Sequence, residues 1–283
     1  MFENIKDKLS HNAEVIESAL LKYYSFTDKD YQSLIEAQRY GILGGGKRIR
    51  ASLALEICKI FGGDLKAVIP YACAIEMIHA SSLIHDDMPC MDNDDMRRGK
   101  PATHKAYGET LALISGDAML VYAFETAIKN PYFDASVNAR AVKILAESTG
   151  NQGMLAGQAI DTIAGKNKLD FEALSRLHKL KTGKLISASA KLGCLAAGVS
   201  ENDKKYVAAV RYAEDIGLAF QIIDDILDYQ EGKRELNSFL SFMSLDEAKE
   251  YANKLTQNGI SAISLYDDGT LTELSHFLTA REY

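Results

Sequence analysis

The chain has 283 residues, of which 47% are hydrophobic and 25% charged, and its formal net charge is −7 at pH 7. This is the composition of an ordinary globular protein, which excludes a collagen-like, disordered or disulfide-dense chain. The acidic balance argues against a nucleic-acid-binding surface, so no nucleic acid is expected as a partner.

Cysteine usage and apolar run lengths indicate where the protein works. The four cysteines show no paired metal-ligand or redox spacing, which fits a reducing compartment: Cys58, Cys73, Cys90 and Cys194. No uncharged apolar run reaches the roughly 18 residues that a membrane span needs. We therefore expect a cytoplasmic protein without stable membrane anchoring.

Apolar residues recur at helical spacing along nearly the whole chain, and no convincing period-two strand interrupts them. We predict about ten to twelve helices, over residues 3–23, 28–43, 47–61, 65–88, 105–129, 134–150, 152–163, 170–183, 185–198, 202–231 and 244–257, before a frayed C-terminal segment. Only short glycine and Asn-Pro turns separate these helices. The sequence therefore predicts one all-α domain, a helical bundle over residues 1–283. The segment 185–198 is apolar on most faces and should be a central buried helix.

An acidic cluster follows the apolar helix that we expect over residues 65–88. Asp86 and Asp92 are six residues apart, which on a continuous helix would place them about 240° from each other around the axis. Pro89 disfavours the helical conformation at Met88, so the chain can fold Asp92 back over the face that Asp86 presents. The alternative is a solvated acidic loop.

A second acidic cluster lies on the helix expected over residues 202–231. Asp224 and Asp228 are four residues apart and so share one face of that helix, among large apolar neighbours. Carboxylates there are costly to desolvate unless a cation accompanies them, although a helix cap or an ion-pair set would also explain them. Two acidic clusters on two helices suggest facing walls that bind divalent cations through oxygen atoms.

Basic residues near these clusters indicate an anionic ligand. They follow the triple glycine, the first acidic cluster and a later helix: Lys47, Arg48, Arg50, Arg97, Arg98, Lys100, Lys181 and Lys184. Because Mg²⁺ usually bridges carboxylates to phosphates, a diphosphate is the natural third component. The turn Gly44-Gly45-Gly46-Lys47 lacks the spacing of a nucleotide P-loop, which excludes ATP. Taken singly, each basic residue could equally be a solvated surface charge.

Together these motifs resemble a known family. The motifs are Gly45-Gly46-Lys47-Arg48-Ile49-Arg50, His79, Asp86-Asp87 through Arg97-Arg98-Gly99, Gly157-Gln158, Lys181-Thr182-Gly183, and Gln221 through Asp228. In this order, from about residue 40 to 230, they resemble the all-trans polyprenyl diphosphate synthases, which include the bacterial short-chain farnesyl and geranylgeranyl diphosphate synthases.

The resemblance implies an all-helical isoprenoid synthase fold around a deep central cavity, a homodimer, and Mg²⁺-dependent joining of isopentenyl diphosphate to an allylic diphosphate. It implies that Mg²⁺ is held by Asp86, Asp92 and Asp224, with Asp87 and Asp228 assisting, and that Asp225 belongs to the catalytic cluster. Contacts to the allylic substrate fall to Arg97, Lys181, Thr182 and Gln221, and contacts to isopentenyl diphosphate to Lys47, Arg50, His79 and Arg98. His79 could instead be a core histidine with satisfied hydrogen bonds.

One departure from the family concerns the loop after Asp228. Relatives carry a longer loop there with a Gly-Lys pair, whereas this sequence has roughly a dozen residues fewer, with Gly232 and Lys233 in its place. We expect a shortened lid over the diphosphates. Either Lys233 replaces the missing lysine or the activity falls below that of relatives with the full loop.

Two rival functions follow from the same motifs. A class I terpene cyclase shares the fold but usually replaces the second cluster, and a non-catalytic regulatory subunit of a heteromeric synthase tends to lose one cluster. This chain retains both clusters, which favours prenyl elongation.

Product length is expected to depend on the residues just before the first acidic cluster. Ser82 lies one helical turn, about 5.4 Å, below Asp86, and Ser81 precedes it. Farnesyl-producing relatives tend to carry an aromatic ring at Ser81, so two serines favour geranylgeranyl over farnesyl diphosphate. Deeper residues such as Ile75, Ile78, Met119 or Tyr122 would then stop growth. The alternative is that both serines pack against a neighbouring helix.

Overall fold

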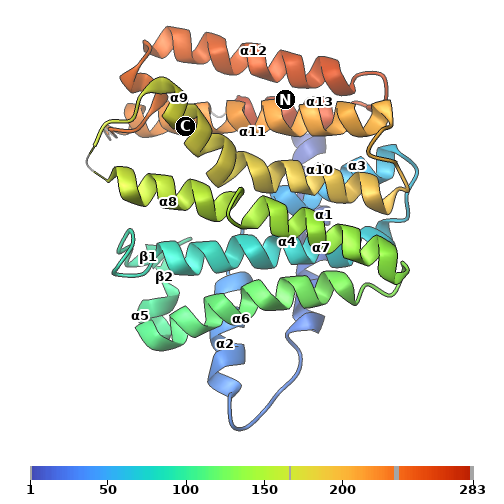
Figure 1. The fold of residues 1–283 in the computed structure, drawn as a ribbon, viewed down its shortest axis with the longest axis vertical. Helices are drawn as coiled ribbons and strands as arrows, with labels where there is room; N and C mark the ends of the chain where they lie inside the picture. Colours follow the sequence, from blue (N-terminus) through green and yellow to red (C-terminus); the bar gives the residue numbers. More distant parts are fainter. Residues whose placement is uncertain (1, 166, 233–235, 281–283) are drawn as a thin grey trace.

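The computed structural model of the protein describes residues 2–165, 167–232 and 236–280 (Figure 1). These residues form α-helices joined by short turns, with one small hairpin. The helices are α1 (Glu3–Tyr23), α2 (Gln32–Ile42), α3 (Ile49–Ile60), α4 (Leu65–Asp86), α5 (Thr103–Tyr107), α6 (Glu109–Ile128), α7 (Ala135–Thr149), α8 (Met154–Ala164), α9 (Phe171–His178), α10 (Lys184–Ala196), α11 (Lys204–Gln230), α12 (Leu245–Ile263) and α13 (Thr270–Thr279).

The all-α fold class is confirmed. The exceptions in the described residues are the antiparallel pair β1 (Met96–Arg97) and β2 (Lys100–Pro101), a π-helical turn η1 (Lys179–Gly183) and a 3-10 turn η2 (Phe239–Ser241). In Figure 1 the longer helices from α4 to α12 run roughly side by side across the view, and α2 crosses them. The hairpin lies beside the end of α4.

Two predicted segments differ from the structure. The helix expected over residues 105–129 is divided into α5 and α6, because Gly108 adopts a φ of 83° that ends one helix and begins the next. The frayed C-terminal segment was a wrong prediction. Helix α12 continues to Ile263, and α13 buries Leu271, Leu274 and Leu278, whose spacing places them on one face.

Helix α10 is the central buried helix that the sequence predicts. Within it, every residue from Leu185 to Ala196 is buried except Lys191. Gly193 lets α10 approach α3 closely, because a Cβ there would lie 2.7 Å from the carbonyl oxygen of Ala54. This close packing fills the core. Helices α4 and α11, which carry the two acidic clusters, lie around it.

Among the described helices, α4 and α6 are long and apolar enough to span a membrane by length and composition alone. The apolar window of α4 is 78% buried inside the protein, which is the pattern of a core helix. The corresponding window of α6 is only 39% buried, because one of its faces is left uncovered.

Candidate functional site

The first acidic cluster lies at the C-terminal end of α4. The helix ends at Asp86, two residues before the predicted end, and the chain then turns back through Pro89. The backbone N–H of Asp92 donates to the carbonyl oxygen of Asp86 at 2.9 Å, and that of Asn93 donates to Met88 at 3.1 Å. Asp92 therefore returns to the end of α4, as the position of Pro89 predicts.

The carboxyl group of Asp86 lies in a crowded and partly buried environment. Burial raises its pKa to about 6; Asp92 and Asp87 add to the rise, and the nearby Lys181 opposes it. The pKa of Asp92 is also raised, mainly by burial. Two partly desolvated carboxylates at one helix end are a site that favours a cation.

Asp87 and Arg97 form an ion pair beside this cluster. Asp87 is only 2% exposed, and Arg97 donates to its Oδ1 from Nε at 2.8 Å and also from Nη2. Arg97 further contacts Asp94 at 3.0 Å. The pair attaches β1 to the end of α4 and holds the Arg97 guanidinium next to Asp86.

A cavity of about 450 Å³ opens in front of Asp86. It brings together six of the residues singled out in the sequence: Arg50, His79, Ser82, Asp86, Lys181 and Thr182. Apolar side chains and Cys90 cover much of the remaining wall, including Met88, Met91, Leu113, Met154 and Leu155. Neither Lys47 nor Ser81 lines this cavity. An apolar chamber with acidic and basic groups at one end fits an amphiphilic anion.

Arg50 lines the basic end of the cavity. Burial lowers the pKa of Arg50, as does Arg98, while Glu76 and Asp224 oppose the change. In the described structure the Nε of Arg50 is buried without a hydrogen-bond partner. A buried guanidinium with an unused donor suits a phosphate oxygen.

His79 lies within this cationic group rather than in a satisfied core position. Its pKa is well below the usual value because the ring is buried and because Arg50, Arg98, Arg48 and Arg97 surround it. The imidazole is therefore neutral near pH 7 and can donate one N–H to an anion without adding charge.

The π-helical turn η1 carries Lys181 and Thr182 into the cavity. Lys181 Nζ contacts Asp161 on α8 at 2.6 Å, and the Thr182 hydroxyl donates to Oε1 of Gln221 at 3.1 Å. Gly157 allows α8 to lie against this turn, because a Cβ there would overlap the backbone of Lys181. Such π-helical turns are frequent at functional sites.

Asp225 supports Gln221 from behind. Its Oδ1 accepts from Gln221 Nε2 at 3.4 Å, and its Oδ2 accepts from the backbone N–H of Phe239 at 2.8 Å. Asp225 is buried, whereas Asp224 and Asp228 on the same helix are half-buried. The structure thus places Asp225 as a positioning residue for Gln221, with its carboxylate engaged by neighbouring protein groups.

His178, at the start of η1, makes the stability of this region sensitive to acid. Its ring is 8% exposed and stacks on Phe239 with centroids 5.1 Å apart, and its Nε2 has no partner among the described residues. Burial lowers the pKa of His178 to about 4. A lowered histidine pKa means that its contribution to stability is complete above about pH 6.5 and is lost as the pH falls towards 4.

We expect His178→Phe to remove part of the acid sensitivity, because Phe keeps the stack and cannot bind a proton. Between pH 7 and 4.5 the wild-type free energy of unfolding should fall by about 2 kcal/mol more than that of the variant. Denaturant unfolding at both pH values measures this difference. Equal losses in the two proteins would contradict the buried, neutral assignment of His178.

The residues fit the divalent cation that the sequence suggests. The donors at the end of α4 are neighbouring carboxylates, of which Asp92 and Asp87 raise the pKa of Asp86, and those on α11 are carboxylates one turn apart. No group of three His, Cys, Asp or Glu side chains converges within the described part of the chain. That arrangement suits Mg²⁺, which is usually bound by one or two carboxylates together with substrate phosphates and water.

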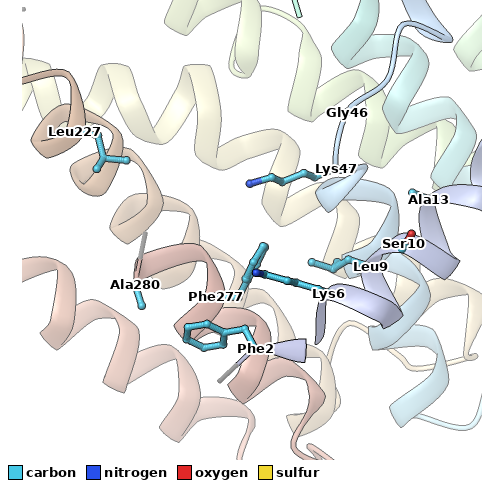
Figure 2. Close-up of a pocket in the computed structure, with 10 residues that line it drawn as sticks. All are labelled: Phe2, Lys6, Leu9, Ser10, Ala13, Gly46, Lys47, Leu227, Phe277 and Ala280. Atoms are coloured by element: carbon cyan, nitrogen blue, oxygen red, sulfur yellow. The ribbon is translucent and has the colours of Figure 1, made fainter. Parts of the chain in front are cut away.

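A larger cavity of about 740 Å³ lies between α1, α11, α13 and the turn before α3 (Figure 2). Figure 2 shows Lys47 and Lys6 reaching towards Phe277, with Lys47 Nζ 5.3 Å from the centre of that ring. No carboxylate is among the residues that line this cavity. The structure therefore places Lys47 in a different cavity from Arg50 and His79, and Asp86 lines the smaller of the two.

Two features of the site were not found from the sequence. Asp161, the partner of Lys181, lies three residues beyond Gln158, so its place on the same helical face was available as a signal. The methionine wall of the cavity carries no local signal. Lys233 lies outside the described residues, so its predicted role stays a prediction.

Comparison with known proteins identifies the family. Residues 31–239 match the polyprenyl synthetase family. A geranylgeranyl diphosphate synthase of Cyanophora paradoxa is 38% identical over 94% of this chain and 92% of its own length. A chloroplastic geranylgeranyl pyrophosphate synthase of Catharanthus roseus is 38% identical over 87% of this chain and 73% of its own.

Solved structures agree with the sequence comparison. An FPP/GFPP synthase from Zymomonas mobilis superposes with a TM-score of 0.91 at 37% identity, covering 99% of this chain and 100% of its own. A geranyltransferase from Legionella pneumophila gives a TM-score of 0.90 at 31% identity, covering 98% and 96%. The similarity extends over nearly the whole chain and includes both acidic clusters. The chain therefore belongs to the polyprenyl synthetase family.

Proposed function

We propose that this prenyltransferase joins isopentenyl diphosphate to the allylic diphosphates dimethylallyl, geranyl and farnesyl diphosphate, and that geranylgeranyl diphosphate is its main product. The single observation that carries the proposal is the cavity in front of Asp86, where that carboxylate, the basic side chains of Arg50 and Lys181 and an apolar wall meet. An allylic diphosphate needs three features in its binding site: carboxylates that hold a metal ion against its phosphates, cations that balance its charge, and an apolar wall for its tail.

The protein's own groups supply binding and charge stabilisation. Arg50, Arg98 and neutral His79 form the anion site that we assign to isopentenyl diphosphate, and Lys181 lies on the opposite side against Asp161. Bound Mg²⁺, held by Asp86, Asp92 and Asp224 with Asp87 and Asp228 assisting, would neutralise the allylic diphosphate and make it a better leaving group. The hydrogen-bonded oxygen atoms of Thr182 and Gln221 would offer fixed negative dipoles to the positive charge that develops on the allylic carbon.

The reaction needs no protein nucleophile. The bond between the allylic carbon and its diphosphate oxygen breaks, and the double bond of isopentenyl diphosphate attacks the resulting allylic cation. A proton then leaves the new carbon chain, and the departing diphosphate can accept it. The apolar wall formed by Met88, Met91 and Met154 keeps water from the cation.

Incubation of the purified protein with isopentenyl and dimethylallyl diphosphates and Mg²⁺, followed by product identification, tests the proposal. A linear C15 or C20 diphosphate supports it. A cyclic hydrocarbon would indicate a terpene cyclase, and no product without a partner protein would indicate a regulatory subunit. The relatives named above are synthases and give neither rival support.

The uncovered face of α6 supports a homodimer. Large apolar side chains are exposed on α6 and on α8: Leu113, Ile114, Val121, Ile128, Leu155 and Ile163. A group of exposed apolar side chains on one helix is typical of a subunit interface. We expect Val121→Glu to convert a dimer into a monomer in light scattering, with Val207→Glu on α11 as the exposed control. A monomeric wild-type protein would contradict this assignment.

We also propose a cytoplasmic location, in keeping with four free cysteines.

A further inference from the structure

The hairpin that carries Arg97 and Arg98 is fastened to the chain that leads into α3. Lys100 Nζ donates to the carbonyl oxygen of Tyr40 at 2.7 Å and lies 3.8 Å from the centre of the Tyr40 ring. The Tyr40 hydroxyl donates in turn to the carbonyl oxygen of Pro101 at 2.7 Å. Arg98 Nη1 donates to the carbonyl oxygen of Gly45. The hairpin and the segment 40–46 are therefore joined at several points.

Lys100 is held by a carbonyl group and an aromatic face. Its ammonium group is half-buried, and burial and the nearby Arg98 lower its pKa. A charge-assisted hydrogen bond to a backbone carbonyl fixes that backbone more firmly than a neutral hydrogen bond would. The contact with the Tyr40 ring adds a cation–π interaction.

Gly44 makes room for this lysine. A Cβ at Gly44 would lie 2.5 Å from Lys100 Nζ and 2.6 Å from its Cε. Gly44 is absent from the glycines with positive φ, unlike Gly45 and Gly46, so its backbone would accept a side chain. A side chain at residue 44 would therefore displace the Lys100 ammonium group from this position.

We propose that Lys100 is a positioning residue that fixes the Gly44–Lys47 turn against the β1–β2 hairpin and so sets where Arg98 lies relative to Arg50. The inference rests on the proposed function, in which Arg50, Arg98 and neutral His79 bind isopentenyl diphosphate. Arg97 is fixed independently through Asp87. Loss of Lys100 should therefore weaken binding of isopentenyl diphosphate and leave the allylic substrate little affected.

Lys100→Met tests the inference, because methionine keeps the apolar stem and removes the charge. We expect the KM for isopentenyl diphosphate to rise about tenfold, with kcat and the KM for dimethylallyl diphosphate within about twofold of wild type. Lys105→Met is the matched control, since Lys105 is exposed on α5 and pairs only with the exposed Asp95 at 2.7 Å. Unchanged KM values in Lys100→Met would overturn the proposal.

Amide hydrogen exchange of substrate-free protein separates this inference from the proposed function. Residues 43–47 should exchange faster in Lys100→Met than in wild type and in Lys105→Met. Equal exchange overturns the fastening role, and faster exchange with an unchanged KM overturns its link to substrate. A wild-type protein without turnover would instead refute the proposed function, while the exchange result would still decide the role of Lys100.

A double-mutant cycle with Gly44 provides an independent test. Gly44→Ala alone should raise the KM for isopentenyl diphosphate, because its Cβ displaces Lys100. Lys100→Ala removes the atoms that would overlap, so the double variant should be no worse than Lys100→Ala. Non-additivity of this kind supports direct coupling between the two positions, and additive effects would contradict it.

Discussion

Replacement of Asp86 or Asp224 by alanine is expected to lower kcat by about 10³-fold or more while leaving the helical fold intact. Each change removes a carboxylate that would hold Mg²⁺ against the substrate diphosphate, and the charge stabilisation that the metal supplies is lost with it. Turnover at saturating Mg²⁺ and far-ultraviolet circular dichroism measure the two effects.

Asp95→Ala is the matched control for this prediction. Asp95 belongs to the same acidic run but is exposed and pairs with Lys105 on α5, so its loss should change kcat by less than about threefold. Turnover near the wild-type rate in Asp86→Ala or Asp224→Ala would contradict a metal site built from two facing walls.

The carboxylate of Asp86 should lower the stability of the metal-free protein. Because the pKa of Asp86 in the folded state is raised to about 6 from 3.8, the charged form is disfavoured on folding. The resulting loss of stability is present above about pH 6 and disappears as the pH falls below 4. Asp86→Asn should therefore raise the melting temperature at pH 7.5 by about 2 °C after allowance for solvent screening. A lower melting temperature in Asp86→Asn would contradict the crowded-carboxylate assignment.

The helices could be predicted from the sequence where one face is consistently apolar. Helix α1 has the predicted bounds, and its buried residues Ile5, Leu9, Ile16 and Leu20 follow helical spacing. Helix α13 was not predicted from its apolar pattern, because it spans only ten residues and begins after Gly269. Its order depends on contacts with distant elements, such as the hydrogen bond from the Tyr212 hydroxyl to the carbonyl oxygen of Leu271 at 2.8 Å. Such contacts leave little trace in a local pattern.

The candidate site also has a part that the sequence could predict and a part that it could not. The acidic clusters are local motifs, so their spacing alone indicated their chemistry. The groups that orient them are distant in sequence: Lys181 with Asp161, Lys100 with Tyr40, and Asp225 with Phe239. Lys47 is the opposite case, a residue close to Arg50 in the sequence whose side chain points elsewhere. The turn after Gly46 directs Lys47 towards Phe277. Side-chain direction within a motif thus needed the structure.

The two serines below Asp86 differ in a way that bears on product length. Ser82 lines the cavity and is half-buried, with its hydroxyl bonded to the carbonyl oxygen of His79 at 2.9 Å. Ser81 is 2% exposed, bonds to Ile78 at 3.0 Å and is absent from the cavity lining. The structure therefore places Ser82, and not Ser81, at the cavity wall, so the product-length prediction for this cavity rests on Ser82.

We expect Ser82→Phe to shorten the main product by at least one five-carbon unit, because an aromatic ring about 5.4 Å below Asp86 would block the growing tail. Ser82→Ala is the control and should leave the product distribution unchanged. Ser81→Tyr should instead overpack the core and lower the melting temperature, by an amount equivalent to about 1–3 kcal/mol, without shortening the product. Chromatography of the dephosphorylated products, with thermal unfolding of each variant, separates these outcomes. Shortening in Ser81→Tyr but not in Ser82→Phe would show that the tail descends along the other face of α4.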